Sequence, residues 1–282
     1  MHPTGIDEVR RYHARMTPNG TWHSRLTSTG QAAQLWFIEW WQLVHLGALL
    51  LVLAFSPSSY SRESRIVLGR HIYINTAPIL LGFSLLCALV TVVLTRIVLV
   101  TALSYGLSQY ALQVVIRVLV LELIPLTAAM FVALRCTIPD GAELTAMQSS
   151  GELDEMRRLG VEPIRRVVLP RVVAGIFSGI TLAALSSVVA LMVAYVAVYG
   201  FALSGLAGYT RLFGQVFTPA VTLIFVLKTI FFCLAVSLIP MASALYGMRG
   251  ASVRTSAEMR GLVRMFAVIL LIEVASLIGN YY

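Results

Sequence analysis

The sequence predicts an all-α integral membrane protein, and its composition and the lengths of its apolar stretches support this fold class. Of the 282 residues, 58% are hydrophobic and only 12% are charged, and the mean hydropathy is +0.84. A soluble domain has about 25% charged residues, so these few charges cannot cover the surface of a globule of this size. Disorder is excluded as well, because so apolar a chain cannot stay solvated.

Six apolar stretches follow a polar N-terminal segment. We expect residues 1–30 to form a flexible cytoplasmic tail, with a short helix near Asp7–Met16, because prolines and glycines are scattered among its arginines and histidines. A helix needs about 20 residues to cross the hydrocarbon core, and irregular backbone cannot face lipid. All six stretches are therefore candidate membrane helices, at about 35–55, 72–104, 111–136, 172–203, 218–248 and 265–282.

The basic residues indicate which stretches cross the bilayer. Sixteen of the 21 lie in four polar segments, 1–34, 56–71, 137–171 and 249–264. By contrast, 105–110 has no basic residue and 204–217 has only Arg211. Because basic segments stay on the cytoplasmic side, the pattern predicts five spans that begin near residue 72. The N-terminus is then cytoplasmic and the C-terminus lies on the far side.

The first stretch, 35–55, is predicted to lie in the cytoplasmic interface. If it crossed the bilayer, the basic segments on its two sides would be separated, against the positive-inside bias. Trp36, Glu39, Trp40, Trp41 and Gln42 crowd its first half, as is typical of an interfacial amphipathic helix. The alternative is an ordinary first span with an aromatic belt at one end.

Charged residues within or near the ends of the spans are the first candidates for function. A charge in hydrocarbon is costly and normally faces a partner or an aqueous cavity, although each one alone could reach an interface instead. Glu122 points away from Arg117 on a helical wheel, so we expect its partner on another helix. Glu273, in the last span, looks isolated. The other charged candidates are Arg96, Arg117 and Lys228.

Four small residues spaced by four form a stripe on the third span. Gly175, Gly179, Ala183 and Ser187 would lie on one helix face and permit a close helix–helix approach. The stripe could pack inside the subunit or between subunits, and the sequence favours the first.

The polar segment 137–171 is long for a simple connection. Pro139-Asp140-Gly141 predicts a turn, after which apolar residues recur at helical spacing until Gly160 and Pro163 end the pattern. Such a helical loop often docks a cytoplasmic partner, and a solvated helix pair is the alternative. Apolar positions would fill a groove on the partner and carboxylates would lie at the rim. The candidate contacts are Glu143, Leu144, Met147, Leu153, Asp154, Met156 and, at the end of the segment, Arg171.

Catalysis by this chain is not expected. The sequence has no Gly-x-x-x-x-Gly-Lys-Ser/Thr phosphate loop, so it lacks that route to ATP hydrolysis. Its five histidines have no metal-ligand spacing with cysteines or carboxylates. The arginines adjoin apolar stretches, which favours a membrane surface over nucleic acid. We predict no catalytic residue, no metal site and no bound cofactor.

The segment from Glu122 to Arg171 carries a run of short motifs in a fixed order. Glu-Leu-x-Pro is followed ten residues after its proline by an arginine, then by Ala-Glu-Leu-x-x-Met, and Pro-Arg closes the segment. This run resembles the MlaE family of ABC-transporter permeases. Ile124 and Thr145 replace family glycines, which indicates a divergent member. The matching residues include Glu122, Pro125, Arg135, Glu143, Met147, Pro163, Pro170 and Arg171, and downstream Lys228 and Arg260.

The resemblance covers about residues 31–282 and implies one permease domain with an interfacial helix, five spans and cytoplasmic coupling helices between the second and third spans. It implies a bacterial inner-membrane subunit that moves phospholipid or a similar hydrophobic molecule between that membrane and the cell envelope. Implied partners are a cytoplasmic ABC ATPase that binds ATP and Mg, a periplasmic MCE-domain protein, and a second permease copy, with a homodimer expected. A non-transporting scaffold paralogue and a secondary transporter are the alternatives.

The residue patterns above, taken together with the resemblance, predict roles for individual residues. The set Glu143, Leu144, Met147, Leu153, Asp154, Met156 and Arg171 would couple the permease to the ATPase. Substrate-cavity or intramembrane polar contacts would come from Arg96, Arg117, Glu122 and Pro125. Structural positions that match the family are Arg135, Pro163, Pro170, Lys228 and Arg260.

Overall fold

The structure, a computed structural model, describes residues 20–56, 62–246 and 251–281. Every regular element in these ranges is a helix and none is a strand, which confirms the predicted all-α class. Six helices are long and apolar enough to cross a membrane, judged by length and composition alone. The expected tail with its short helix near Asp7–Met16 falls mostly outside the described residues.

The chain divides into two compact units, Met1–His45 and Leu46–Tyr282. Helix α2 (Gly20–Phe55) belongs to both units and begins well before the expected residue 35. Its part Phe37–Phe55 meets the length and apolarity of a span, so an interfacial position for this helix stays a prediction. Within the second unit, Leu46 and Leu50 of α2 are buried.

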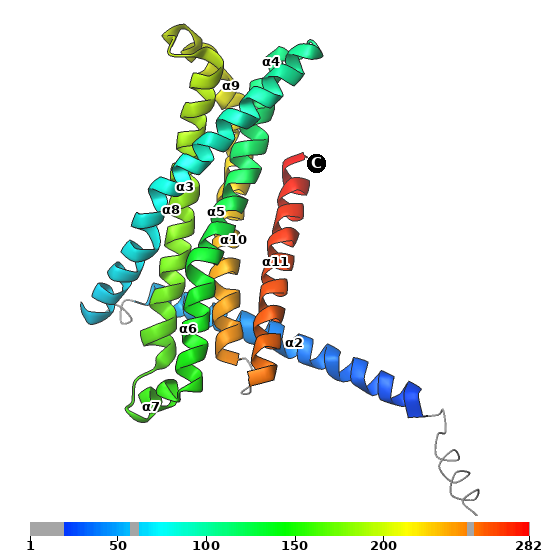
Figure 1. Ribbon diagram of the computed structural model, residues 1–282, viewed down its shortest axis with the longest axis vertical. Coiled ribbons are helices and arrows are strands. Elements are labelled where there is room, and N and C mark those ends of the chain that lie inside the picture. The colour runs from blue at the N-terminus through cyan, green and yellow to red at the C-terminus, as the bar shows by residue number, and fades with distance from the viewer. Residues whose placement is uncertain (1–19, 57–61, 247–250, 282) are drawn as a thin grey trace, which may run out of the picture. The chain divides into compact units, whose positions relative to one another are not determined.

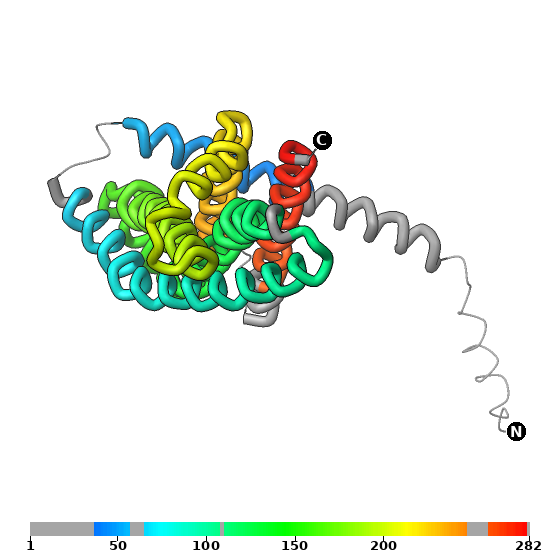
Figure 2. The backbone as a smooth tube through the Cα atoms, turned by 90° about the horizontal axis from the view of Figure 1, so that it is seen from above, coloured from blue at the N-terminus to red at the C-terminus, as the bar shows by residue number. Residues whose placement is uncertain are grey.

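The long helices of the second unit run side by side (Figure 1). Helix α3 (Arg62–Ser104) packs along α8 (Leu169–Tyr199), while α10 (Pro219–Tyr246) contacts both α8 and α11 (Ala251–Tyr281). α3 runs obliquely to its neighbours in Figure 1, and seen from above it lies along one edge of the bundle (Figure 2). Among the described residues, these helices lie close to the predicted spans, except that α3 and α11 start about ten or more residues earlier.

The second predicted span is part of one unbroken helical stretch, Tyr110–Ser149. Two segments of it, η2 (Ile116–Leu123) and η3 (Ala133–Thr137), are π-helical, and a third π-helical segment, η4 (Ile164–Val168), precedes α8. A π-helical turn widens the hydrogen-bond ladder to i→i+5 and occurs frequently at functional sites. The regular elements of the stretch are α4 (Ser108–Val115), α5 (Ile124–Val132) and α6 (Ile138–Ser149).

The turn predicted at Pro139-Asp140-Gly141 is wrong, because α6 begins at Ile138 and includes all three residues. Pro139 comes just after the π-helical segment η3, where the regular i→i+4 hydrogen-bond ladder is already interrupted, so the helix continues through it. The chain turns instead at Gly151 and Gly160, whose φ angles are 81° and 74°. These glycines flank α7 (Glu152–Arg158), so the segment is a pair of short helices.

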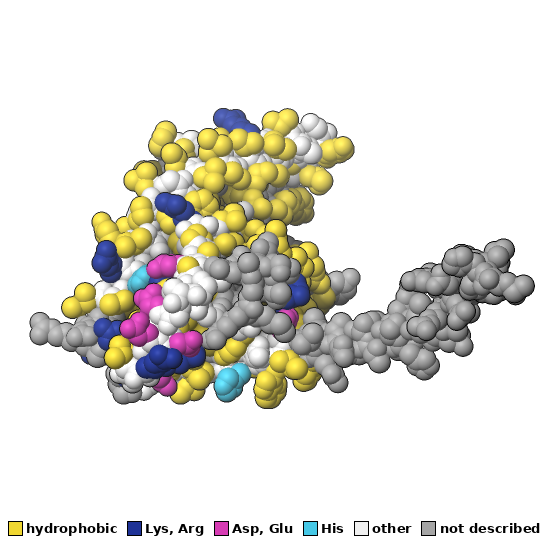
Figure 3. All heavy atoms as spheres, turned by 60° about the horizontal axis from the view of Figure 1, so that its bottom comes forward, with side chains coloured by type: hydrophobic (Ala, Val, Ile, Leu, Met, Phe, Trp, Pro, Cys, Tyr) yellow, Lys and Arg dark blue, Asp and Glu magenta, His cyan; other side chains and the backbone are white. Residues whose placement is uncertain are grey.

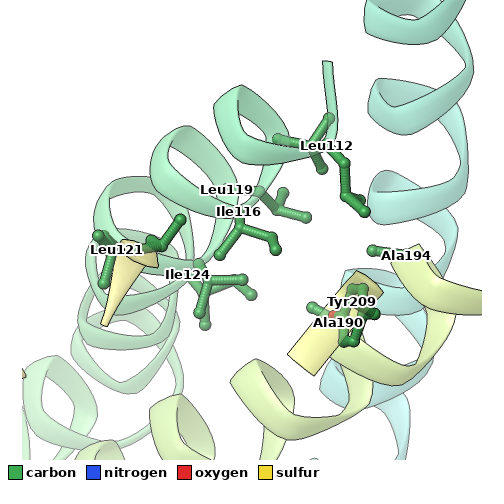
Figure 4. Close-up of a cluster of buried hydrophobic side chains, with 11 residues drawn as sticks. Leu112, Ile116, Leu119, Leu121, Ile124, Ala190, Ala194 and Tyr209 are labelled. Carbon is green, nitrogen blue, oxygen red and sulfur yellow. The ribbon is translucent and has the colours of Figure 1, made fainter. Parts of the chain in front are cut away.

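At the end of the bundle that holds α9 (Leu206–Val216), apolar side chains from five elements, α4, η2, α5, α8 and α9, form a core (Figure 4). Ile116, Leu119 and Ile124 point toward Ala190 and Tyr209 in this view. The Tyr209 hydroxyl donates to the Leu191 carbonyl at 2.8 Å. Burial raises the pKa of Tyr209 to about 12, so the phenol keeps its proton and the hydrogen bond to α8.

The stripe of small residues on α8 packs inside the subunit. A Cβ added at Gly175 would lie 2.7 Å from Ser237 Oγ, and one added at Gly179 would lie 2.5 Å from Cys233 Sγ. Both neighbours are on α10, so the two glycines let α8 and α10 approach each other closely. In lipid, where burial of apolar side chains gives little advantage, such close contact is a main source of helix association.

Gly179→Ala is therefore expected to lower the free energy of unfolding by about 1–3 kcal/mol, the usual cost of an overpacked core. Reversible unfolding of the purified protein in mixed micelles measures this change. Removal of the obstructing sulfur in the double variant Gly179→Ala/Cys233→Ala should restore part of the loss. Gly82→Ala on α3 is the matched control, since a Cβ there meets nothing within 4 Å. Equal effects at both glycines would contradict the packing argument.

Candidate functional site

The site centres on Lys228, a cation buried in the middle of α10. Its side chain is 1% exposed. The ammonium lies 2.8 Å from Glu273 Oε2 on α11, pairs with Glu122 Oε2 on η2, and donates to the Leu121 carbonyl at 3.4 Å. The Phe232 ring, one turn along α10, has its centroid 5.6 Å from Nζ. One ammonium therefore joins three helical elements, through hydrogen bonds to Glu122 and the Leu121 carbonyl and an ion pair with Glu273.

The two carboxylates of the cluster are also largely shielded. The Glu122 side chain is 12% exposed and that of Glu273 is 19% exposed. Asn280, two turns after Glu273 on α11, donates from Nδ2 to Glu122 Oε1 at 3.4 Å. We call Glu122, Lys228, Glu273 and Asn280 the charge cluster. It is the main polar link between α11 and the rest of the bundle among the described residues.

The other candidate polar residues of the spans lie apart from this cluster. Arg96 is exposed on α3, and Arg117 is half-buried on η2 with its Nε unpartnered. Pro125 is buried in the first turn of α5, directly after η2. Glu122 thus pairs with residues of α10 and α11 and not with Arg96 or Arg117.

At the other end of the long helical stretch, Arg171 attaches α6 to α8. The side chain of Arg171 is 7% exposed, and its Nη2 lies 3.0 Å from Glu143 Oε1. Its Nη1 donates to the Asp140 carbonyl at 3.2 Å. A buried guanidinium thus holds both the backbone and a side chain of α6. Arg171 positions the helix and does not itself present a surface to a partner.

The apolar residues of α6 and α7 divide into two groups. Leu144 and Leu153 are 0% and 2% exposed, so they pack inside the chain. Met147 and Met156 are half-buried, and Leu159 just after α7 is 75% exposed. The surface open to a partner is therefore formed by Met147, Met156 and Leu159.

Charged side chains surround these positions. Figure 3, which brings the bottom of Figure 1 forward, shows acidic and basic side chains gathered at this end of the bundle. Glu143 is 62% exposed and Asp154 is 42% exposed, and the latter pairs with Arg157 at 3.3 Å. We call Glu143, Met147, Asp154, Met156 and Leu159 the coupling surface.

A small apolar cavity of about 100 Å³ lies where α6 meets α10 and α11. A Cβ added at Gly141 would lie 3.3 Å from the Pro240 carbonyl oxygen, and one added at Gly261 on α11 would lie 2.3 Å from Ser243 Oγ. The junction therefore combines two close approaches at glycines with a cavity beside them. The cavity is lined by Ile138, Gly141, Ala142, Thr145, Pro240, Ser243, Ala244, Gly261 and Leu262.

The remaining residues of the predicted set have separate positions. Pro163 and Pro170 are buried next to η4 and in the first turn of α8. Arg135 and Arg260 are exposed. No group of three or more His, Cys, Asp or Glu side chains within the described ranges could hold a metal ion.

Two members of the charge cluster, Glu273 and Asn280, were missed by the sequence reasoning, which treated Glu273 as isolated. Only Glu122 and Glu273 are carboxylates in the middle of the spans, and that scarcity was a usable signal. The spacing of Glu273, Ser276 and Asn280 at i, i+3 and i+7 also places three polar residues on one helix face. This pattern does not predict which helix the three residues contact.

The long apolar helices and the paired charges between them define a multi-pass, all-helical membrane protein. The sequence model of the family described as Permease MlaE matches residues 68–278, about three quarters of the chain, and the chain belongs to this family. It is thus an MlaE-family ABC transporter permease subunit.

One curated relative supports the same class. A Rickettsia prowazekii (strain Madrid E) protein, named a probable ABC transporter permease protein, is 28% identical over 152 residues. The match covers 52% of this chain and 58% of the relative, so the chain spans little more than half of that protein's length.

Lys228→Met is expected to be among the most destabilising single changes in the spans. It leaves Glu122 and Glu273 facing each other without a cation, and removal of one partner of a buried ion pair costs about 3–5 kcal/mol. Unfolding in mixed micelles measures the loss, and Arg96→Met, which removes an exposed cation from α3, is the control. A Lys228→Met protein as stable as the control would show that the cluster contributes nothing to packing.

Proposed function

We propose that this chain is the membrane-spanning subunit through which an ATP-driven transporter moves phospholipid or a similar hydrophobic molecule. The family assignment supports a permease role, and the charge cluster supports a hydrophobic cargo. The charges buried in the bundle are paired with one another across helices, and the spans otherwise present apolar side chains. Such an interior offers few polar groups to coordinate an ion along a path.

Energy for transport would come from a separate cytoplasmic ABC ATPase that binds ATP and Mg. The coupling surface suits this role, because it is polar at its rim and carries a few accessible apolar side chains. Leu144 and Leu153 hold α6 and α7 in place from inside, and Arg171 fixes α6 to α8. A force applied at Met147 or Met156 would therefore reach the bundle through packed helices.

The remaining features of the assembly follow from the family and from the charge distribution. We propose a bacterial inner-membrane location with a cytoplasmic N-terminus and a periplasmic C-terminus, because sixteen basic residues lie in segments assigned to the inside and one in those assigned to the outside. A second permease copy, with a homodimer expected, and a periplasmic MCE-domain protein would complete the path for lipid.

Reconstitution tests this function directly. The tagged permease should copurify with an ATPase, and vesicles containing the complex should move a labelled phospholipid when ATP and Mg are supplied. Movement by the permease alone, driven by an ion gradient, would favour a secondary transporter. An assembled complex that hydrolyses ATP but moves no lipid would favour a scaffold.

Met147→Asp is expected to weaken ATPase binding by about 2 kcal/mol or more, roughly 30-fold in Kd, because a buried apolar anchor contributes more than any one rim charge. Affinity of detergent-solubilised permease for the ATPase measures this. Asp154→Asn is the matched control, since exposed ion pairs contribute about 0–1 kcal/mol.

Leu153→Asp separates docking from folding. Leu153 is buried inside the chain, so this change should lower permease stability as well as ATPase binding, whereas Met147→Asp should lower binding alone. Full affinity in the Met147→Asp protein would remove this residue from the coupling surface.

A further inference from the structure

The charge cluster has an unequal number of opposite charges. It contains one ammonium, Lys228, and two carboxyl groups, Glu122 and Glu273, so it has a net charge of −1 when all three groups are ionised. All three side chains are at least four-fifths shielded. An unbalanced charge inside a membrane bundle is costly, and two carboxylates that share one site rarely both stay ionised.

Within the part of the chain that the structure describes, no other cation forms an ion pair with the cluster. The charged groups that act on Glu273 are Lys228 of α10 and Glu122 of η2. Arg117 on η2 makes no ion pair with Glu122, and Arg96 is exposed on α3. On α11 itself, the next basic residue described before Glu273 is Arg264, more than two turns away.

The face of α11 that carries Glu273 also presents unpartnered oxygen atoms. Ser276 is 7% exposed and its Oγ has no hydrogen-bond partner, and Asn280 Oδ1 has none either. Glu273, Ser276 and Asn280 share one helix face. The Asn280 amide oxygen can only accept a hydrogen bond, whereas the Ser276 hydroxyl can donate or accept one. A carboxylic acid O–H on this face is a donor that either oxygen could accept from, whereas a carboxylate is only an acceptor.

We propose that the charge cluster is a proton-binding site that holds one proton at neutral pH, on Glu273. Hydronium in the solvent transfers the proton: its O–H bond breaks, a water molecule is released, an O–H bond forms on the Glu273 carboxylate, and the net charge of the cluster becomes zero. Lys228 then pairs with the carboxylate that remains. This site does not depend on the transported molecule, so it goes beyond the proposed lipid transport.

Protonation of the charge cluster also affects how α11 is attached to α10 and η2. In the neutral cluster, Glu273 joins α11 to α10 without repelling Glu122. Loss of the proton leaves two carboxylates on η2 and α11 competing for one ammonium. The site therefore makes the attachment of α11 sensitive to protonation.

Infrared spectroscopy of the purified permease complex in lipid nanodiscs tests the proposal at pH 7. The wild type should show a carboxylic acid C=O band that shifts in heavy water. Glu122→Gln and Glu273→Gln should each abolish this band, because either variant leaves one carboxylate for one ammonium. Asp154→Asn, which removes an exposed carboxylate of α7, should leave the band unchanged.

Two further measurements keep the test decisive. Glu273→Gln should melt within a few degrees of the wild type, because glutamine mimics the protonated acid, and Glu273→Asp should keep a shifted band if the glutamine variant does not fold. A wild-type spectrum without the band, or a band that survives in both glutamine variants, would overturn the proposal. Stabilisation that requires sodium and is lost in choline buffer would also overturn it, since the site would then hold a metal cation.

Discussion

The fold depends on one buried ammonium. Lys228, the only lysine of the chain, lies buried near the centre of α10. A cation there is tolerated only where its charge and its N–H donors have partners. η2 and α11 provide those partners from opposite ends of the sequence, 106 residues before Lys228 and 45 after it. Because lipid cannot solvate the ion, the positions of both elements are fixed by it. The same bond network that stabilises the bundle thus also defines its polar centre.

Close backbone contact is the second constraint, and it acts where the ion cluster does not. Gly175 and Gly179 bring α8 against Ser237 and Cys233 of α10, one to three turns from Lys228 along the same helix. α10 therefore presents small side chains to α8 and its charged side chain to η2 and α11. This division explains why α10 is among the most buried of the long apolar helices.

Much of this architecture was predictable from the sequence, because helix formation in a membrane follows from length and apolarity alone. The family was predictable from motif order between Glu122 and Arg171. The pairing of charges was not, since Glu122 had several possible cations and a helical wheel assumes 3.6 residues per turn. The π-helical turns of η2 depart from that value, and no local sequence pattern predicts them.

The coupling segment shows a second kind of limit. Helical spacing identified Leu144, Met147, Leu153 and Met156 as one apolar set, yet two of them are buried inside the chain and two are half-exposed. Periodicity tells which residues share a face but not whether that face meets the protein itself or a partner. The turn expected at Pro139 was wrong for a related reason, because the same three residues are compatible with a turn and with a helix that continues from the π-helical segment η3.

The unbroken helical stretch Tyr110–Ser149 connects the charge cluster to the coupling surface. Glu122 lies in its first π-helical segment, and Glu143, held by Arg171, lies in its last regular part. No loop separates the two, so in the proposed transporter a displacement of α6 could be absorbed before it reaches the charge cluster only at the π-helical segment η3. The stretch can yield only where its hydrogen-bond ladder is irregular, at η2 and η3, or by shifting against α10 and α11 beside the apolar cavity at Gly141. In the proposed transporter, the π-helical segment that holds Glu122 is therefore where motion of the coupling surface would change the contact between α11 and the rest of the bundle.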